Sequence, residues 1–184
     1  MKRLMTMLLA VSMVGCAGSV NGSVGGVSLS VADAIFGTVK DNSGKIYAAS
    51  IFMADKPKLC DSLKANRQPK QMTALQMTII RTNDTEFLAP DVGEYTVRDN
   101  PLTPNALSAG ASFVRTDANC TNTLSANATD AKSGLIKVTG FKAETNGNAA
   151  GTFDITFGSG DKVTGNFNAS YCDLSSLSET PNCE

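Results

Sequence analysis

Apolar and polar residues alternate most clearly in the last third of the chain. Between residues 152 and 157 every second position is apolar, and a similar alternation returns between residues 163 and 171. A period of two predicts β-strands that bury one face. Ser159-Gly160 between the two strands suits a tight hairpin turn. We therefore expect the apolar residues of both strands to share one core: Phe153, Ile155, Phe157, Val163, Phe167 and Tyr171.

A third strand is predicted immediately before this hairpin. Residues 135–143 are followed by Asn146-Gly147, a dipeptide typical of two-residue type I′ turns. Three successive strands joined by short turns predict an antiparallel meander at the C-terminal end of the domain.

The first half of the chain is less regular but also rich in predicted strands. One segment differs: in residues 57–65 a proline at the start and the spacing of Leu59 and Leu63 predict a short helix. The fold class is therefore all-β: an antiparallel β-sandwich, which we favour, or a flattened small barrel of about eight strands with one short helix. The further predicted strands cover residues 34–40, 45–53, 75–80, 94–98 and 111–115.

Residues 1–15 have the pattern of a signal peptide. Lys2 and Arg3 precede an uninterrupted run of apolar and small residues from position 4 to position 14. This run is shorter than the roughly 20 residues that a membrane-spanning helix needs, and it matches the apolar region of an export signal.

The end of this run carries a lipid-attachment motif. Met13-Val14-Gly15-Cys16 resembles the lipobox of bacterial lipoproteins, in which the cysteine is linked to diacylglycerol; the family usually has Leu where this chain has Met13. The resemblance implies a mature protein anchored to a membrane through Cys16. Because Ala17 rather than Asp follows, it implies the outer membrane. The alternative is an ordinary secretory signal, with Cys16 removed or free.

The segment after Cys16 has the composition of a linker. Residues 17–30 are dominated by Gly, Ser and Asn, which predicts a flexible tether with a reach of roughly 20 Å. The expected organisation is a signal peptide at 1–15, a lipid anchor and tether at 16–32, and a β-rich extracytoplasmic domain at 33–184.

Four cysteines remain beyond Cys16: Cys60, Cys120, Cys172 and Cys183. An even number in an exported chain predicts disulfides. Three pairings are open, and we favour Cys60–Cys120 with Cys172–Cys183, which would pin the C-terminal tail to the last strand.

Composition argues against several functions. The net charge is −1, or −3 once Lys2 and Arg3 are removed, so nucleic-acid binding through phosphate contacts is not expected. The chain has no His, the commonest general base and metal ligand. Ser62 and Lys64 would not face each other on a helix. We expect no catalytic residues, no cofactor and no metal.

Two charged groups remain as weaker candidates. A basic cluster in residues 56–70 could touch anionic lipid head groups or a glycan, although a solvated face is favoured. Asp154, Asp161 and Asp173 could together bind calcium, although solvated carboxylates are favoured. The basic cluster consists of Lys56, Lys58, Lys64, Arg67 and Lys70.

Several segments resemble a family of predicted bacterial envelope lipoproteins of unknown function. They are residues 48–63, the sequence Asp117-Ala118-Asn119-Cys120, and residues 151–157 with the glycine-containing motifs at 160–161 and 165–167. The resemblance implies a fold class and supplies no site.

The predicted function is a non-catalytic, membrane-anchored binding or structural module. Its partners would be the membrane, through the N-terminal lipid, and an envelope protein or glycan bound by loops 99–110 and 117–132. The alternative is a lipocalin-like carrier of a small apolar ligand.

Overall fold

The computed structural model describes residues 17–175 and 181–184. Cys16 and the signal peptide therefore lie outside the described residues. Besides two short helices, α1 (Leu59–Lys64) and α2 (Ala126–Thr129), the chain forms β-strands. The strands are β1 (Gly18–Gly22), β2 (Asp33–Lys40), β3 (Ile46–Ala54), β4 (Arg67–Gln68), β5 (Thr73–Thr82), β6 (Phe87–Leu88), β7 (Gly93–Arg98), β8 (Leu107–Arg115), β9 (Ala131–Phe141), β10 (Asn148–Phe157), β11 (Lys162–Tyr171) and β12 (Asn182–Cys183).

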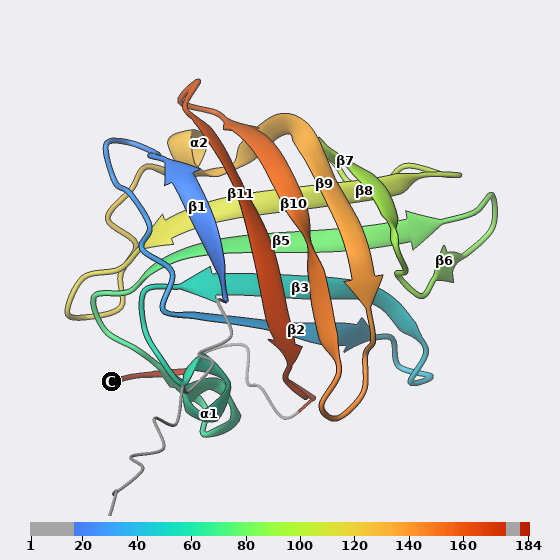
Figure 1. The fold of residues 1–184 in the computed structure, drawn as a ribbon, viewed down its shortest axis with the longest axis horizontal. Helices are drawn as coiled ribbons and strands as arrows, with labels where there is room; N and C mark the ends of the chain where they lie inside the picture. The colour runs from blue at the N-terminus through green and yellow to red at the C-terminus, as the bar shows by residue number, and fades with distance from the viewer. Residues whose placement is uncertain (1–16, 176–180) are drawn as a thin grey trace, which may run out of the picture.

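Eight strands close into a barrel in the order β2-β3-β5-β8-β7-β9-β10-β11 (Figure 1). The ring closes where β11 pairs in parallel with β2, Ser170 with Ile35 and Tyr171 with Phe36. Strands β9–β11 cross in front of β2, β3, β5 and β8, so the barrel is flattened into two walls. The all-β class is confirmed, in its barrel form. The sandwich that we favoured is wrong, because pairings at both edges, β7 with β8 and β11 with β2, join the two walls into one ring. Alternation along the strands is the same in both forms and cannot distinguish them.

The interior of the barrel is filled with side chains. Inward positions of all eight strands contribute to one apolar cluster, including the inner faces predicted for the hairpin of β10 and β11. The largest interior side chains are less than 2% exposed, whereas a ligand-sized void would leave part of their surface accessible. They include Phe36, Met77, Tyr95, Phe113 and Phe157.

A second, smaller apolar cluster lies outside the barrel under α1. Leu59 and Leu63 of the helix pack with Ile35, Ala74 and Cys172. The first helical N–H groups lack intrahelical partners, and Leu59 N donates to the Asp33 carboxylate at 2.8 Å. The predicted helix is confirmed, and its two leucines face the body as expected.

The segment expected to be a flexible tether is part of the fold. Residues Gly18–Gly22 pair antiparallel with β11 as strand β1, and Val24 and Leu29 are buried in the core. Gly18 permits this contact because a Cβ there would lie 2.3 Å from the carbonyl oxygen of Asn166. The tether prediction fails because the sparse apolar residues of this segment find places on the barrel, where their burial offsets the entropy of ordering.

Both disulfides form, but their pairing differs from the favoured one. The bonds are Cys60–Cys172 and Cys120–Cys183. The first fastens α1 to the end of β11. The second fastens the C-terminal strand β12, which pairs in parallel with β4 rather than with the last barrel strand. Spacing along the chain misled the prediction because partners in a barrel are set by strand pairing.

The connection between β9 and β10 is longer than predicted. Asn146 has a positive φ of 63°. However, β9 ends at residue 141 and β10 begins at residue 148, so six residues rather than two form the turn. Gly147 is required for close approach, since a Cβ would lie 1.9 Å from the Lys142 carbonyl oxygen. The antiparallel meander itself is confirmed.

Two disulfides indicate an oxidising location outside the cytoplasm. No helix within residues 17–175 and 181–184 has the length and apolar character needed to cross a membrane.

Candidate functional site

Polar side chains line part of one end of the barrel, beside the apolar segment that precedes β2. Met53 of β3, Leu75 of β5 and Phe113 of β8 point into the barrel near this end. Successive inward positions in a strand are two residues apart, so the next inward position toward the end lies two residues further on each strand. The residues reached are Asp55, Thr73 and Arg115.

Backbone pairing places these three residues side by side. Thr73 is directly opposite Arg115 in the β5–β8 ladder. Asp55 N donates to the Thr73 carbonyl at 3.0 Å, and Thr73 N donates to the Asp55 carboxylate at 2.9 Å. A carboxylate, a hydroxyl and a guanidinium therefore form one row across three neighbouring strands.

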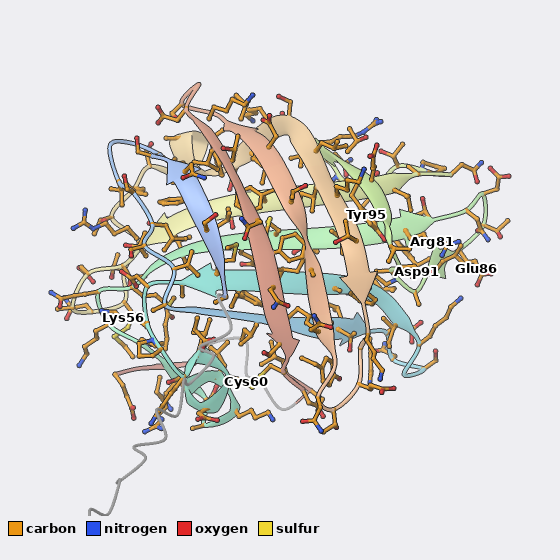
Figure 2. The ribbon with its side chains drawn as sticks, viewed as in Figure 1. Lys56, Cys60, Arg81, Glu86, Asp91 and Tyr95 are labelled. Carbon is orange, nitrogen blue, oxygen red and sulfur yellow. A yellow bond between two sulfur atoms is a disulfide. The ribbon has the colours of Figure 1, made fainter. Side chains whose placement is uncertain are left out.

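A cavity of about 590 Å³ opens over this row. We call it the mouth cavity; its walls add Lys56, Gln71, Asp117 and Thr123 to the row. Figure 2 labels Lys56 near this end of the molecule.

The acidic and basic side chains of the mouth cavity differ in whether they have bonding partners within the protein. Asp55 and Asp117 each accept backbone N–H groups, Asp117 from Asn119 and Thr121 at 2.8 and 2.9 Å. Within the described part of the chain, neither Lys56 nor Arg115 has an ion-pair partner. The cavity therefore presents two cationic donors together with the remaining carboxylate oxygens.

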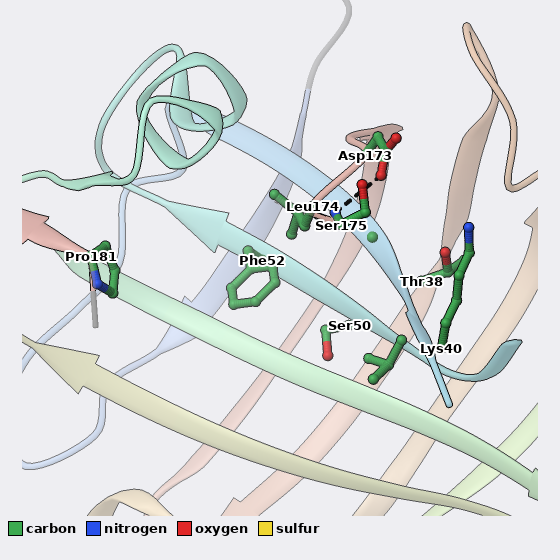
Figure 3. Close-up of a pocket in the computed structure, with 10 residues that line it drawn as sticks. Thr38, Lys40, Ser50, Phe52, Asp173, Leu174, Ser175 and Pro181 are labelled. Atoms are coloured by element: carbon green, nitrogen blue, oxygen red, sulfur yellow. Dashed lines mark hydrogen bonds between the residues drawn. The ribbon is translucent and has the colours of Figure 1, made fainter. Parts of the chain in front are cut away.

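A second cavity, of about 500 Å³, lies on the outer surface of β2 and β3 (Figure 3). Val39, Phe52 and Leu174 supply its apolar surface, and Asp173 lies at its edge. Backbone and side-chain hydrogen bonds from Ser175 hold the pKa of Asp173 below its ordinary value. This outer groove offers apolar surface together with the polar side chains of Thr38, Lys40 and Ser50.

The opposite side of the barrel is occupied by a tyrosine. The Tyr95 hydroxyl donates to the Asp91 carbonyl at 2.7 Å and accepts from Asp91 N at 3.0 Å (Figure 2). Burial raises the pKa of Tyr95, so the phenol stays protonated. Its hydrogen bonds fix the turn before β7, which is a structural role.

The two loops predicted to bind a partner lie apart. Residues 107–110 of the first belong to β8, and residues 131–132 of the second belong to β9. The remaining loop residues flank opposite ends of the nine-residue strand β8, which spans roughly 30 Å. They cannot form one contact surface. Only the second loop contributes to the mouth cavity.

The basic cluster does not form a uniformly positive surface. Arg67 pairs with Glu184 at 3.1 Å, and Lys64 lies close enough to Asp173 to help lower the pKa of that carboxyl. Asp61 lies in the first turn of α1, three residues before Lys64. Acidic neighbours therefore compensate Lys64 and Arg67, which favours the solvated face that we preferred.

The three aspartates considered for calcium lie in separate settings. Asp154 pairs with Lys162 at 2.9 Å. Asp161 accepts from Gly25 N at 2.7 Å, whereas Asp173 follows the other end of β11. No group of three His, Cys, Asp or Glu side chains suited to a metal occurs among the described residues.

The mouth cavity was missed by the sequence analysis, although a signal was present. Arg115 follows Phe113 by two positions and Asp55 follows Met53 by two, so each continues an inward row. The sequence does not show that the two rows end at the same edge of the barrel, because that depends on the pairing of β3, β5 and β8.

No protein-family model matches the chain, and searches of curated proteins and of solved structures find no significant match either.

Proposed function

We propose that the protein is a non-catalytic, exported binding module, anchored to a membrane through lipidated Cys16, that binds a polar ligand in the mouth cavity. The observation that carries the proposal is the row Asp55–Thr73–Arg115 below an open cavity of about 590 Å³. Ligand pockets typically measure about 300–1,000 Å³.

The chemistry of the cavity favours a glycan or another ligand that offers both donors and acceptors. Lys56 and Arg115 are free to donate, while Thr73 and the remaining oxygens of Asp55 and Asp117 can accept. A ligand rich in hydroxyl groups, or one with an acidic group near Arg115, would satisfy both kinds of partner. Binding without turnover is consistent with a chain that has no His and whose described cysteines are all disulfide-bonded.

The ligand site can be tested with soluble neutral and acidic glycan fragments. Titration of the isotope-labelled protein should shift the amide resonances of residues 55, 73 and 115, and Arg115→Ala should weaken binding at least about tenfold, equivalent to about 1.4 kcal/mol. Arg98→Ala, an exposed arginine on β7, is the matched control and should bind normally. Equal weakening by both variants, or shifts confined to other surfaces, would refute the mouth cavity as the site.

Membrane anchoring rests on the lipobox resemblance and is tested separately. Metabolic labelling with a palmitate analogue should tag the wild-type chain and miss Cys16→Ser. Two acyl chains are enough for stable attachment. Equal labelling of both chains would contradict the anchor.

A second candidate is a lipocalin-like carrier of a small apolar ligand, favoured by the closed eight-stranded barrel itself. The filled interior argues against it, because the ligand would have to displace core side chains that are less than 2% exposed. An apolar fluorophore titrated against the protein tests the carrier. Saturable binding to the wild type that is lost in Ala109→Leu, which adds side-chain volume to the interior, would favour the carrier over the mouth-cavity module.

A further inference from the structure

The distance between Cys16 and the barrel is one peptide unit. Ala17 packs against the core, and its carbonyl accepts a hydrogen bond from Asn168 N at 3.0 Å. Because consecutive Cα atoms are about 3.8 Å apart, the anchoring residue is held at the wall of the barrel, whatever conformation it takes.

Strand β1 is firmly attached, so this short distance is a property of the fold. All five residues Gly18–Gly22 pair with β11. The Asn166 side chain donates to the Ser19 hydroxyl at 3.0 Å, and Gly25 N donates to Asp161 at 2.7 Å. Val24 behind the strand is fully buried, so releasing β1 would expose core surface.

The surface beside Ala17 has an unusual composition. Strands β1, β11 and β10 lie side by side on one face (Figure 1), and their outward positions near Ala17 carry Asn, Ser, Thr and Ala but no charged side chain. Charged side chains border this surface at Thr152: Asp154, two positions along β10, pairs with Lys162, and Lys137 of β9, directly opposite Thr152, pairs with Glu94. We call this surface the amide face; its central residues are Ser19, Asn148, Thr152, Asn166 and Asn168.

We propose that the amide face lies against the lipid head groups of the membrane, with the barrel held in one orientation by its anchor. This inference rests on the proposed lipidation of Cys16. A membrane-bound acyl chain joined to the wall through a single residue keeps the Ala17 end of the amide face close to the head-group layer. Uncharged amides and hydroxyls can hydrogen-bond to phosphate and ester oxygens, and no ion has to be desolvated when they do so.

The orientation has a consequence for the proposed binding site. The mouth cavity is formed by β3, β5, β8 and the loop after β8, which belong to the wall behind the amide face in Figure 1. With the amide face on the membrane, the mouth cavity remains open to the surrounding solution.

The absence of tryptophan from the chain makes the orientation measurable by fluorescence. Single-Trp variants of the full lipidated protein, Thr152→Trp on the amide face and Gln76→Trp on β5 of the opposite wall, are bound to phosphatidylethanolamine–phosphatidylglycerol vesicles containing brominated phosphatidylcholine. We expect quenching by bromine to be at least about threefold stronger at position 152 than at position 76. Thermal unfolding of each variant in detergent verifies that it is folded.

A spacer variant sharpens the test. Inserting twelve Gly and Ser residues between Cys16 and Ala17 should leave vesicle binding intact and reduce the quenching at position 152 toward that at position 76. Equal quenching at both positions in vesicle-bound protein without the spacer would overturn the orientation. Protein that does not bind vesicles at all, and is not labelled by the palmitate analogue, would instead overturn the proposed lipid anchor.

Discussion

The C-terminal meander and the seam of the barrel are built by different rules, although they share strand β11. In the meander, β9, β10 and β11 follow one another and each pairs with its sequence neighbour. At the seam, β11 meets β1 along its first half and β2 at Ser170 and Tyr171. These partners come from the opposite end of the chain, about 135 to 150 residues away.

This difference affects both prediction and stability. Local hairpins cost little loop entropy and reveal their register by alternation. The seam depends on long-range closure, and the structure supplements its few backbone pairs with a disulfide and with the close glycine contacts of β1. We therefore expect destabilising substitutions in the meander to unfold the whole domain. Destabilising substitutions at the seam should instead separate β11 from β1 and β2 while the rest of the barrel stays folded.

The largest expected effect comes from the interior of the meander. Phe157 is 1% exposed and lies edge-on to Phe113 of β8, with ring centroids 6.2 Å apart. Phe157→Ala should lower the free energy of unfolding by about 3–5 kcal/mol. Thr152→Ala, on the exposed face of the same strand, should cost under about 1 kcal/mol. Denaturant titration measures both, and similar costs would mean that the register of β10 is wrong.

The next effect concerns the disulfide beside the seam. Cys172 follows β11 directly, and its N–H donates to the Phe36 carbonyl of β2 at 2.8 Å. Replacing Cys60 and Cys172 together by Ser should cost about 2–5 kcal/mol. The amide hydrogens of the β2–β11 contact should exchange faster than those of the meander.

The second disulfide provides the control for this comparison. Replacing Cys120 and Cys183 by Ser frees β12 from the loop after β8, away from the seam. It should leave the exchange of the β2–β11 amides nearly unchanged. Equal acceleration of the seam by both double variants would show that the Cys60–Cys172 bond has no special role there.

A smaller effect is expected at strand β1. Gly18→Ala places a Cβ against the Asn166 carbonyl, at a φ of 131°, and should cost about 1–3 kcal/mol through local strain. Gly26→Ala is the matched control, because Gly26 also has a positive φ, 76°, but nothing lies within 4 Å of its Cβ position. Thermal unfolding should rank Gly18→Ala below Gly26→Ala; the reverse order would argue against the tight β1–β11 contact.

The smallest effect is a dependence on pH at the end of β1. The hydrogen bond from Gly25 N, followed by that from Ser159, lowers the pKa of Asp161. A lowered pKa in the folded state means that the carboxylate stabilises the fold at neutral pH, and that this contribution is lost as the pH falls through the lowered pKa. Asp161→Asn should abolish the acid-dependent part of Gly25 amide exchange, measured from about pH 5 down to about pH 2 so that the lowered pKa falls inside the window, with little change in the melting temperature. An unchanged pH profile would contradict the contact.

Which strands could be predicted from the sequence follows the same division between meander and seam. The inner face of β10 and β11 was predicted residue by residue, because apolar residues recur at every second position of β10 from Phe153 to Phe157 and, apart from Gly165, of β11 from Val163 to Tyr171. Helix α1 was predicted from a proline and two leucines. Strand β1 was missed, because five residues with two glycines and one valine carry no alternation strong enough to show pairing.

The candidate site also has a part that the sequence shows and a part that only the fold shows. The sequence contains Asp55 and Arg115 in the inward phase of their strands, which local patterning can show. It does not contain their adjacency, which arises only when β5 lies between β3 and β8 with Thr73 opposite Arg115. The favoured cysteine pairing failed for this reason too, since Cys60 meets Cys172 across the packed outer cluster under α1.

By itself, the sequence determined the strand-rich class, the buried face of each regular strand, the short helix and the presence of disulfides. Each of these follows from interactions between residues close in the chain or from composition. Only the tertiary structure decided that the sheet closes at β2 and β11, that the residues after Cys16 belong to the barrel wall, and which cysteines meet. These features depend on loop closure over tens of residues, where the free energy comes from burial and pairing of the whole ring and leaves no local pattern to read.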